Sequence, residues 1–243
     1  MMSFKSYSDT DNSPAVYTDS EGINFEKKQY FDVNNTEGVV YCDATSQTMY
    51  LAFRGTSGIN DVLMDSNILG REFMGYKAHK GFVKAYEDVY NTVESIIHDI
   101  LECDSNILRV KKLIITGHSL GGALAQLAFV HIKSKFRWSL DALGVSCVAV
   151  SFGSPKLFCA RSVDDALRNL FLESVLRITH SDDVVPILPK YSSFMKKVFK
   201  LEYVHVGQHC SIGEQDDDHS FKEHRITKYV ECLNTTDFYE GGS

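Results

Sequence analysis

One segment of the 243-residue chain, residues 114–123, constrains the fold more than any other. The apolar run Ile114–Thr116 is typical of a strand and leads into a Gly-x-Ser-x-Gly pattern. Ser119 lies in this pattern between Gly117 and Gly121, and a helix-like stretch follows. Such a nucleophile elbow needs glycine on both sides, because the serine is strained and the strand and helix approach too closely for a Cβ. The pattern alone is weak, but between a strand and a helix it predicts acyl-transfer chemistry at Ser119.

Strand-like and helix-like patterns alternate along the chain. Residues 38–55 are typical of an antiparallel hairpin, and residues 82–101 carry apolar side chains at helical spacing. Further strands are expected at 113–116, 145–152, 174–179 and 201–206, and further helices at 119–136, 162–171 and 221–233. This alternation predicts the α/β class, with a mainly parallel central sheet flanked by helices and entered through the antiparallel amino-terminal hairpin. Functional residues of such sheets gather at the carboxyl ends of the strands, where the motifs below lie.

Composition indicates one globular domain over residues 1–243, with poorly ordered ends at 1–20 and 235–243. The net charge of −7 and the lack of a long Lys/Arg block argue against nucleic acid as a partner. No apolar run approaches the roughly 18 residues of a transmembrane segment. Residues 1–19 also lack the apolar core of a signal peptide, so we expect an intracellular or soluble protein.

The six cysteines contain no Cys-x-x-Cys pair, which argues against a zinc site or a redox motif. Cys42 and Cys147 fall within expected strands. We therefore expect buried thiols at both positions rather than disulfides. No metal and no organic cofactor is expected.

A serine hydroxyl is a poor nucleophile, so Ser119 requires a histidine base and a group that orients this base. In α/β-hydrolases the acid and then the histidine follow the serine along the chain. Asp182 and Asp183 come directly after the expected strand 174–179 and precede Pro186, although both could equally serve simple turn chemistry. The histidines that follow are His205, His209, His219 and His224.

Five separated segments resemble the class 3 lipases, the fungal-type triacylglycerol lipase family of α/β-hydrolases. This family also contains diacylglycerol lipases and feruloyl esterases. The matching segments are residues 53–56 (FRGT), 79–82 (HKGF), 117–122 (GHSLGG), 152–155 (FGSP) and 183–186 (DVVP). A sixth segment, residues 203–207, resembles a late strand of the family, in which His205 is not the base. The segments follow the family's order, and the resemblance covers about residues 38–232.

The resemblance implies roles for particular residues. Asp183 is the triad acid, because the family's aspartate lies three residues before the proline, and Asp182 is the alternative. His219 is the base, because the family places its base on a loop before the last helix. His224 and His209 remain alternatives to His219.

The oxyanion of the reaction needs backbone donors. One is the N–H of Leu120, the residue after the nucleophile. By resemblance, the other comes from Thr56, although a Gly-Thr turn closing a hairpin is the simpler interpretation. The family uses the next segment as a lid, and residues 58–74 could contact a lipid surface transiently. A fixed surface helix is the competing interpretation of this segment.

These residues lead to the hypothesis of a serine carboxylester hydrolase, a lipase of lipid degradation. It would cleave acylglycerols or related lipid esters through an acyl-enzyme. The alternatives are a non-lipid esterase acting on feruloyl or small esters, an acyltransferase, and a catalytically silent binding protein with the hydrolase fold.

Overall fold

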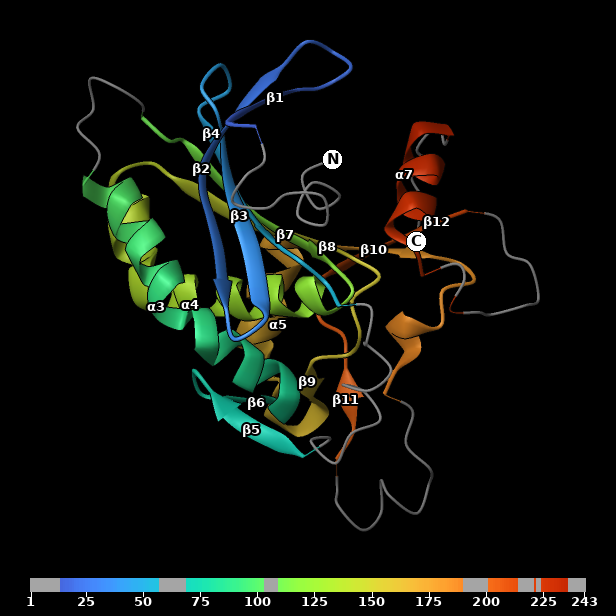
Figure 1. Cartoon of the computed structure of the whole chain (residues 1–243). Coiled ribbons are helices and arrows are strands. Elements are labelled where there is room, and N and C mark those ends of the chain that lie inside the picture. The colour runs from blue at the N-terminus through green and yellow to red at the C-terminus, as the bar shows by residue number, and fades with distance from the viewer. Residues whose placement is uncertain are drawn as a thin grey trace.

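The computed structural model of the chain describes residues 14–56, 69–102, 109–189, 201–213, 221 and 224–235. An eight-stranded sheet with the order β1-β2-β3-β4-β7-β8-β10-β12 forms its centre (Figure 1). Its strands are β1 (Val16–Thr18), β2 (Asn24–Val33), β3 (Thr36–Asp43), β4 (Thr48–Phe53), β7 (Lys112–His118), β8 (Ser146–Phe152), β10 (Val175–His180) and β12 (Gln208–Ile212). Neighbours from β1 to β4 are antiparallel, and neighbours from β4 to β12 are parallel. The predicted α/β-hydrolase class, with its amino-terminal hairpin, is confirmed.

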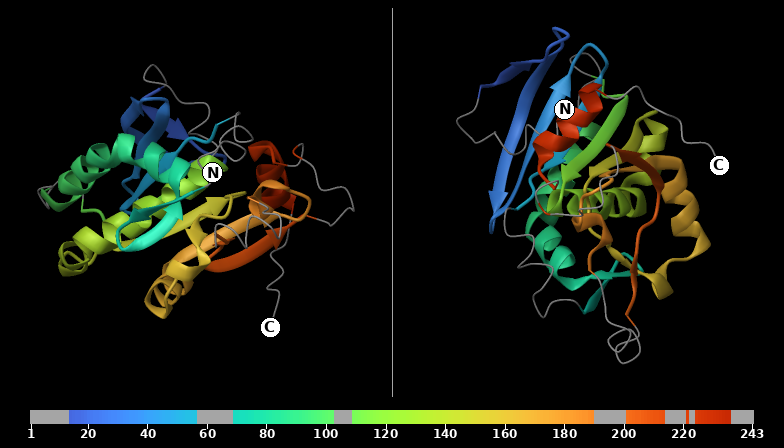
Figure 2. Two further views of the ribbon diagram at one scale, coloured as in Figure 1. Left: turned by 90° about the horizontal axis from the view of Figure 1, so that it is seen from below. Right: turned by 90° about the vertical axis from the view of Figure 1, so that its right-hand side faces the viewer.

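Helices cover both faces of this sheet. They are α3 (Lys80–Glu102), α4 (Leu120–Ala142), α5 (Asp165–Ser174) and α7 (Ile226–Thr235). The first three pack on one face in the main hydrophobic core, whereas α7 packs on the other face against the apolar cluster of β8, β10 and β12 (Figure 2). No described helix is long and apolar enough to cross a membrane.

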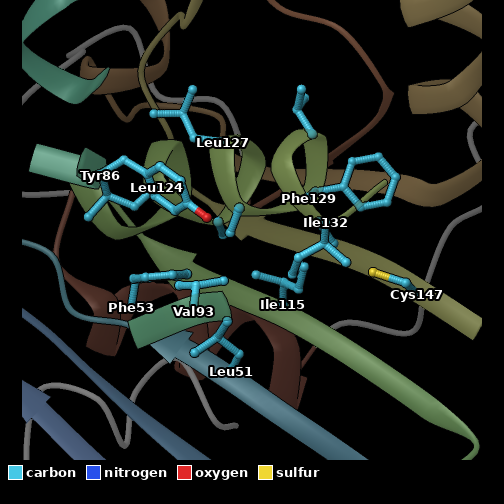
Figure 3. Packing of buried hydrophobic residues seen from close by; sticks show 14 of the residues in the cluster. Leu51, Phe53, Tyr86, Val93, Ile115, Leu124, Leu127, Phe129, Ile132 and Cys147 are labelled. Carbon is cyan, nitrogen blue, oxygen red and sulfur yellow. The ribbon is translucent and has the colours of Figure 1, made fainter. Parts of the chain in front are cut away.

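The apolar stripe of α3 faces the core, as its spacing predicts. Every apolar residue of the stripe is buried: Phe82, Tyr86, Val89, Val93, Ile96, Ile97 and Ile100. Figure 3 shows Tyr86 and Val93 of α3 and Leu124 of α4 near Leu51, Phe53 and Ile115 of the sheet, all in the same hydrophobic cluster. Cys42 and Cys147 are buried in β3 and β8 and form no disulfide, as expected.

A second, four-stranded sheet was not predicted. It has the order β11-β9-β6-β5 and contains β5 (Gly70–Phe73), β6 (Tyr76–His79), β9 (Phe158–Cys159) and β11 (Tyr203–Val204). β5 falls within the expected lid segment 58–74 and is antiparallel to β6. The preceding part of that segment, residues 58–68, lies outside the described residues.

Several boundaries differ from the expectations. The strand expected at 201–206 is reduced to β11, and the edge of the central sheet is formed by β12 instead. β12 was not predicted, because its side chains are mostly polar and give no strand pattern. Within the end expected to be poorly ordered, residues 1–20, Val16–Thr18 forms β1 and pairs with β2. Residues 1–13 and 236–243 lie outside the described residues, and Thr235 ends α7.

Candidate active site

The elbow has the backbone that its sequence predicts. Ser119 connects β7 to α4 with φ of 61° and ψ of −127°, a region that non-glycine residues rarely adopt. A Cβ on Gly117 would lie 2.2 Å from the carbonyl carbon of Gly121. A Cβ on Gly121 would lie 2.4 Å from the carbonyl oxygen of Phe53. Both glycines are therefore required by the close approach of α4 to the ends of β7 and β4.

The Ser119 hydroxyl is buried but unengaged. The residue is only 1% exposed, and its Oγ has no hydrogen-bond partner among the described residues. Its backbone N–H donates to the carbonyl of Phe152 at 2.9 Å. The strained backbone is therefore fixed to the end of β8, while the hydroxyl remains available for chemistry.

The two predicted oxyanion donors lie on segments that meet at the elbow. Leu120 is the first residue of α4, where a backbone N–H has no acceptor within the helix. Thr56 is half-buried and follows the end of β4, the strand end that Gly121 contacts. This placement is compatible with an oxyanion hole formed by the backbone of both residues.

Asp183 accepts three hydrogen bonds just beyond the end of β10. Its Oδ1 accepts the Val185 N–H at 2.8 Å. Its Oδ2 accepts Nδ1–H of His224 at 2.7 Å and the hydroxyl of Tyr229 at 2.5 Å. The carboxylate is 3% exposed, so these bonds compensate for its lost hydration. Asp182 is also buried, and its backbone N–H donates to Nδ1 of His180 at 3.3 Å.

The four candidate histidines occupy different surroundings. His219, the predicted base, lies outside the described residues. His205 donates from Nε2 to the carbonyl of Pro186 at 2.7 Å, and burial lowers its pKa to about 3. His209 forms a hydrogen bond from Nε2 to the Thr179 hydroxyl at 2.8 Å. Among the described histidines, only His224 pairs with Asp183.

Contacts around His224 place its imidazole beside the elbow. The ring stacks on that of His118, the neighbour of Ser119, with centroids 4.5 Å apart. Gly153 follows Phe152, which accepts the Ser119 N–H, and has φ of 54°. A Cβ on Gly153 would lie 2.9 Å from Asp183 Oδ2 and 3.1 Å from His224 Cε1. His224 Nε2 has no hydrogen-bond partner among the described residues.

Tyr229 is a residue that the sequence patterns did not single out. Its hydroxyl donates to Asp183 and accepts the His180 N–H at 3.0 Å. Burial raises its pKa well above 10, so the phenol remains a donor to the carboxylate. Its place in an expected helix gave only a core signal, since an aromatic residue on an apolar helix face usually packs in the interior. Within the described ranges, no cluster of three His, Cys, Asp or Glu residues could hold a metal ion.

A family of known proteins matches more than half of the chain. The family described as Lipase (class 3) matches residues 50–193, from β4 to beyond Asp183. The chain belongs to the class 3 lipase family. As a member of this family, it has the fold that the motifs predicted.

Among curated relatives, the chain is 30% identical over 168 residues to a lipase of Rhizopus niveus, covering 66% of the chain and 39% of that lipase. It is 32% identical over 164 residues to a lipase of Rhizomucor miehei, covering 65% and 42%. It is 25% identical over 182 residues to secreted mono- and diacylglycerol lipase A of Penicillium camembertii, covering 72% and 51%. The chain thus spans about two-fifths to half the length of these relatives.

Solved lipase structures share the fold of this class 3 lipase chain. The Lip2 lipase of Yarrowia lipolytica superposes with a TM-score of 0.65 at 21% identity, covering 87% of this chain and 75% of that one. The Rhizopus niveus lipase II structure gives 0.62 at 22% identity, covering 82% and 78%. The Penicillium relative is named as secreted, so it gives no support to an intracellular location.

Proposed function

We propose that this chain is a serine carboxylester hydrolase that cleaves acylglycerols or related lipid esters through an acyl-enzyme. The observation that carries the proposal is the buried Asp183–His224 pair beside a strained Ser119. Membership of the class 3 lipase family supports the reaction class, and relatives named lipase and mono- and diacylglycerol lipase support a glycerolipid substrate.

The reaction begins when Ser119 Oγ attacks the ester carbonyl and His224 Nε2 accepts its proton. Asp183 holds Nδ1–H of the imidazole, which keeps Nε2 unprotonated before the attack and stabilises the imidazolium that forms. The backbone N–H groups of Leu120 and Thr56 stabilise the oxyanion. His224 then protonates the leaving alcohol, and a water molecule activated by His224 releases the acyl group.

His224 takes the role that the family resemblance assigned to His219. It is the described histidine with one nitrogen on Asp183 and the other unengaged, which is the state a general base requires. Apo active sites often show long contacts between nucleophile and base, so the missing Ser119–His224 hydrogen bond is compatible with this role.

The lipid surface is the finer part of the proposal. Residues 58–74 would contact it transiently, as the family's lid segment does. Within this segment β5 is paired with β6, so that part would move only together with its partner strand. Because contact with a lipid surface would assist the reaction, activity should rise when a soluble ester substrate is replaced by an emulsion of a medium-chain acylglycerol.

The test uses Ser119→Ala and Ser146→Ala, a matched change at an exposed serine at the opposite end of the sheet strands. Hydrolysis of p-nitrophenyl butyrate and labelling by a fluorophosphonate should disappear in the first variant and persist in the second. Undiminished hydrolysis by Ser119→Ala would overturn the proposal. Equal rates on short soluble esters and on acylglycerol emulsions would favour a non-lipid esterase.

A further inference from the structure

His118 is buried next to the nucleophile, yet the proposed reaction gives it no step. The residue is 3% exposed and ends β7 immediately before Ser119. Its ring lies against the imidazole of His224 at an interplanar angle of 29° and forms a hydrogen bond with the His224 backbone. The Tyr229 ring meets His118 edge-on, with centroids 5.4 Å apart and an angle of 70°.

These contacts connect the two halves of the site. His118 ends β7 and Ser119 follows it directly, whereas His224 precedes α7 and is far away in the sequence. The stack restrains the plane of the His224 ring, and the backbone hydrogen bond restrains the segment that carries it. Asp183 holds the ring at Nδ1 only, so it leaves rotation about that hydrogen bond open.

The charge of His118 suits this place. Burial lowers its pKa well below 6.5, and the neighbouring His224 lowers it further. His118 is therefore neutral at neutral pH. A proton accepted by His224 would then lie against a neutral ring, whereas a charged neighbour at this distance would oppose it.

We propose that His118 is a positioning residue that holds the His224 imidazole toward Ser119 by its ring stack and its backbone hydrogen bond. This inference rests on the proposed function. His118 lies between Gly117 and Ser119 of the elbow. The end of β7 would therefore position the base His224 as well as lead into the nucleophile Ser119. Misplacing a catalytic group by about 1 Å can cost about a hundredfold in rate.

The test compares His118→Leu, which removes the ring stack and the hydrogen bond, with His118→Phe, which keeps an aromatic ring. Because substrate binding is not involved, kcat on p-nitrophenyl butyrate should fall about tenfold to a hundredfold in the leucine variant, with KM within about twofold. The phenylalanine variant should recover a large part of this loss. The rate of fluorophosphonate labelling should follow kcat.

The matched control is His131→Leu, which removes another buried histidine that stacks on an aromatic ring, that of Tyr90. It should lower the melting temperature without changing kcat. If His118→Leu does not fold, His118→Asn replaces it with the same expectation. Native kcat in a folded variant without the ring, or a phenylalanine variant no better than leucine, would overturn the inference. If the fluorophosphonate does not label even the native protein, the proposed function itself would be refuted.

Discussion

Two buried histidines of this protein have the same kinds of neighbours. His224 lies by Asp183, the ring of His118 and the elbow that carries the Ser119 hydroxyl. His131 lies by Glu94 at 3.1 Å, stacks on Tyr90 with centroids 4.0 Å apart, and is hydrogen-bonded to the Tyr86 hydroxyl at 2.8 Å. Each site therefore combines a carboxylate, an imidazole, a stacked ring and a hydroxyl.

The difference lies in which atoms are left unengaged. In His131, Nε2–H donates to Glu94, so Nδ1 accepts from the Tyr86 phenol and both ring nitrogens are filled. Glu94 also pairs with Lys135, and the network joins α3 to α4. His224 keeps Nε2 unengaged beside a serine with a strained backbone. The same kinds of chemical groups thus form a structural clamp between two helices in one place and a candidate catalytic centre in the other.

The largest contrast should come from neutralising each carboxylate. Asp183→Asn should reduce kcat about 10⁴-fold, because the imidazole loses the group that fixes its tautomer. Glu94→Gln should leave kcat unchanged and lower the melting temperature. Steady-state kinetics and thermal unfolding of both variants test this contrast, and equal effects on kcat would contradict it.

A second contrast uses two glycines with positive φ. Gly153→Ala should reduce kcat about a hundredfold, because its Cβ would displace Asp183 and His224. Gly144 has φ of +70°, and a Cβ there would have nothing within 4 Å. Gly144→Ala therefore introduces backbone strain without a steric clash. It should destabilise the fold by about 1 kcal/mol and leave kcat native. Similar kcat values for the two variants would show that Gly153 does not make room for the pair.

Removing a single hydroxyl from each network should give a smaller effect. Tyr229→Phe should lower kcat about tenfold, because the Asp183 carboxylate loses one of its three hydrogen bonds. Tyr86→Phe should leave kcat native and cost about 1–3 kcal/mol of unfolding free energy, since Nδ1 of His131 loses its donor. A tenfold loss of kcat in both variants would mean that the hydrogen bonds around His131 also affect catalysis, which would contradict a purely structural role for them.

His79 extends the comparison, because neither of its ring nitrogens has a hydrogen-bond partner among the described residues. Burial lowers its pKa to about 4, so below pH 6.5 the unfolded chain binds a proton that the folded protein does not. Stability is therefore lost as the pH falls, by about 2 kcal/mol from this group between pH 7 and pH 5. His79→Phe should remove that part of the acid destabilisation in urea unfolding at the two pH values. An unchanged difference would contradict the assignment.

Local features of the site could be predicted from the sequence. The elbow depends on consecutive residues, and the stripe of α3 repeats at a regular spacing, so both are visible in a single stretch of chain. Asp183 could be predicted as the acid only from the resemblance of its segment to the family. Cys42 and Cys147 could be predicted as buried because each lies within a strand-like segment of the sequence.

Features that depend on distant contacts could not be predicted. Which histidine meets Asp183 depends on where α7 begins and on the space that Gly153 leaves, and neither has a local signal. β9 and β11 pair over only two residues each, too few for any periodicity. Tyr229 looks like an ordinary core aromatic until its hydroxyl is seen to meet a carboxylate.

The most direct test of the central claim measures labelling of Ser119 by a fluorophosphonate in His224→Ala and His219→Ala. We expect the first variant to lose labelling by at least about a hundredfold, because Ser119 loses its base. The second should label within about threefold of the native rate. Native labelling in His224→Ala together with its loss in His219→Ala would contradict the account.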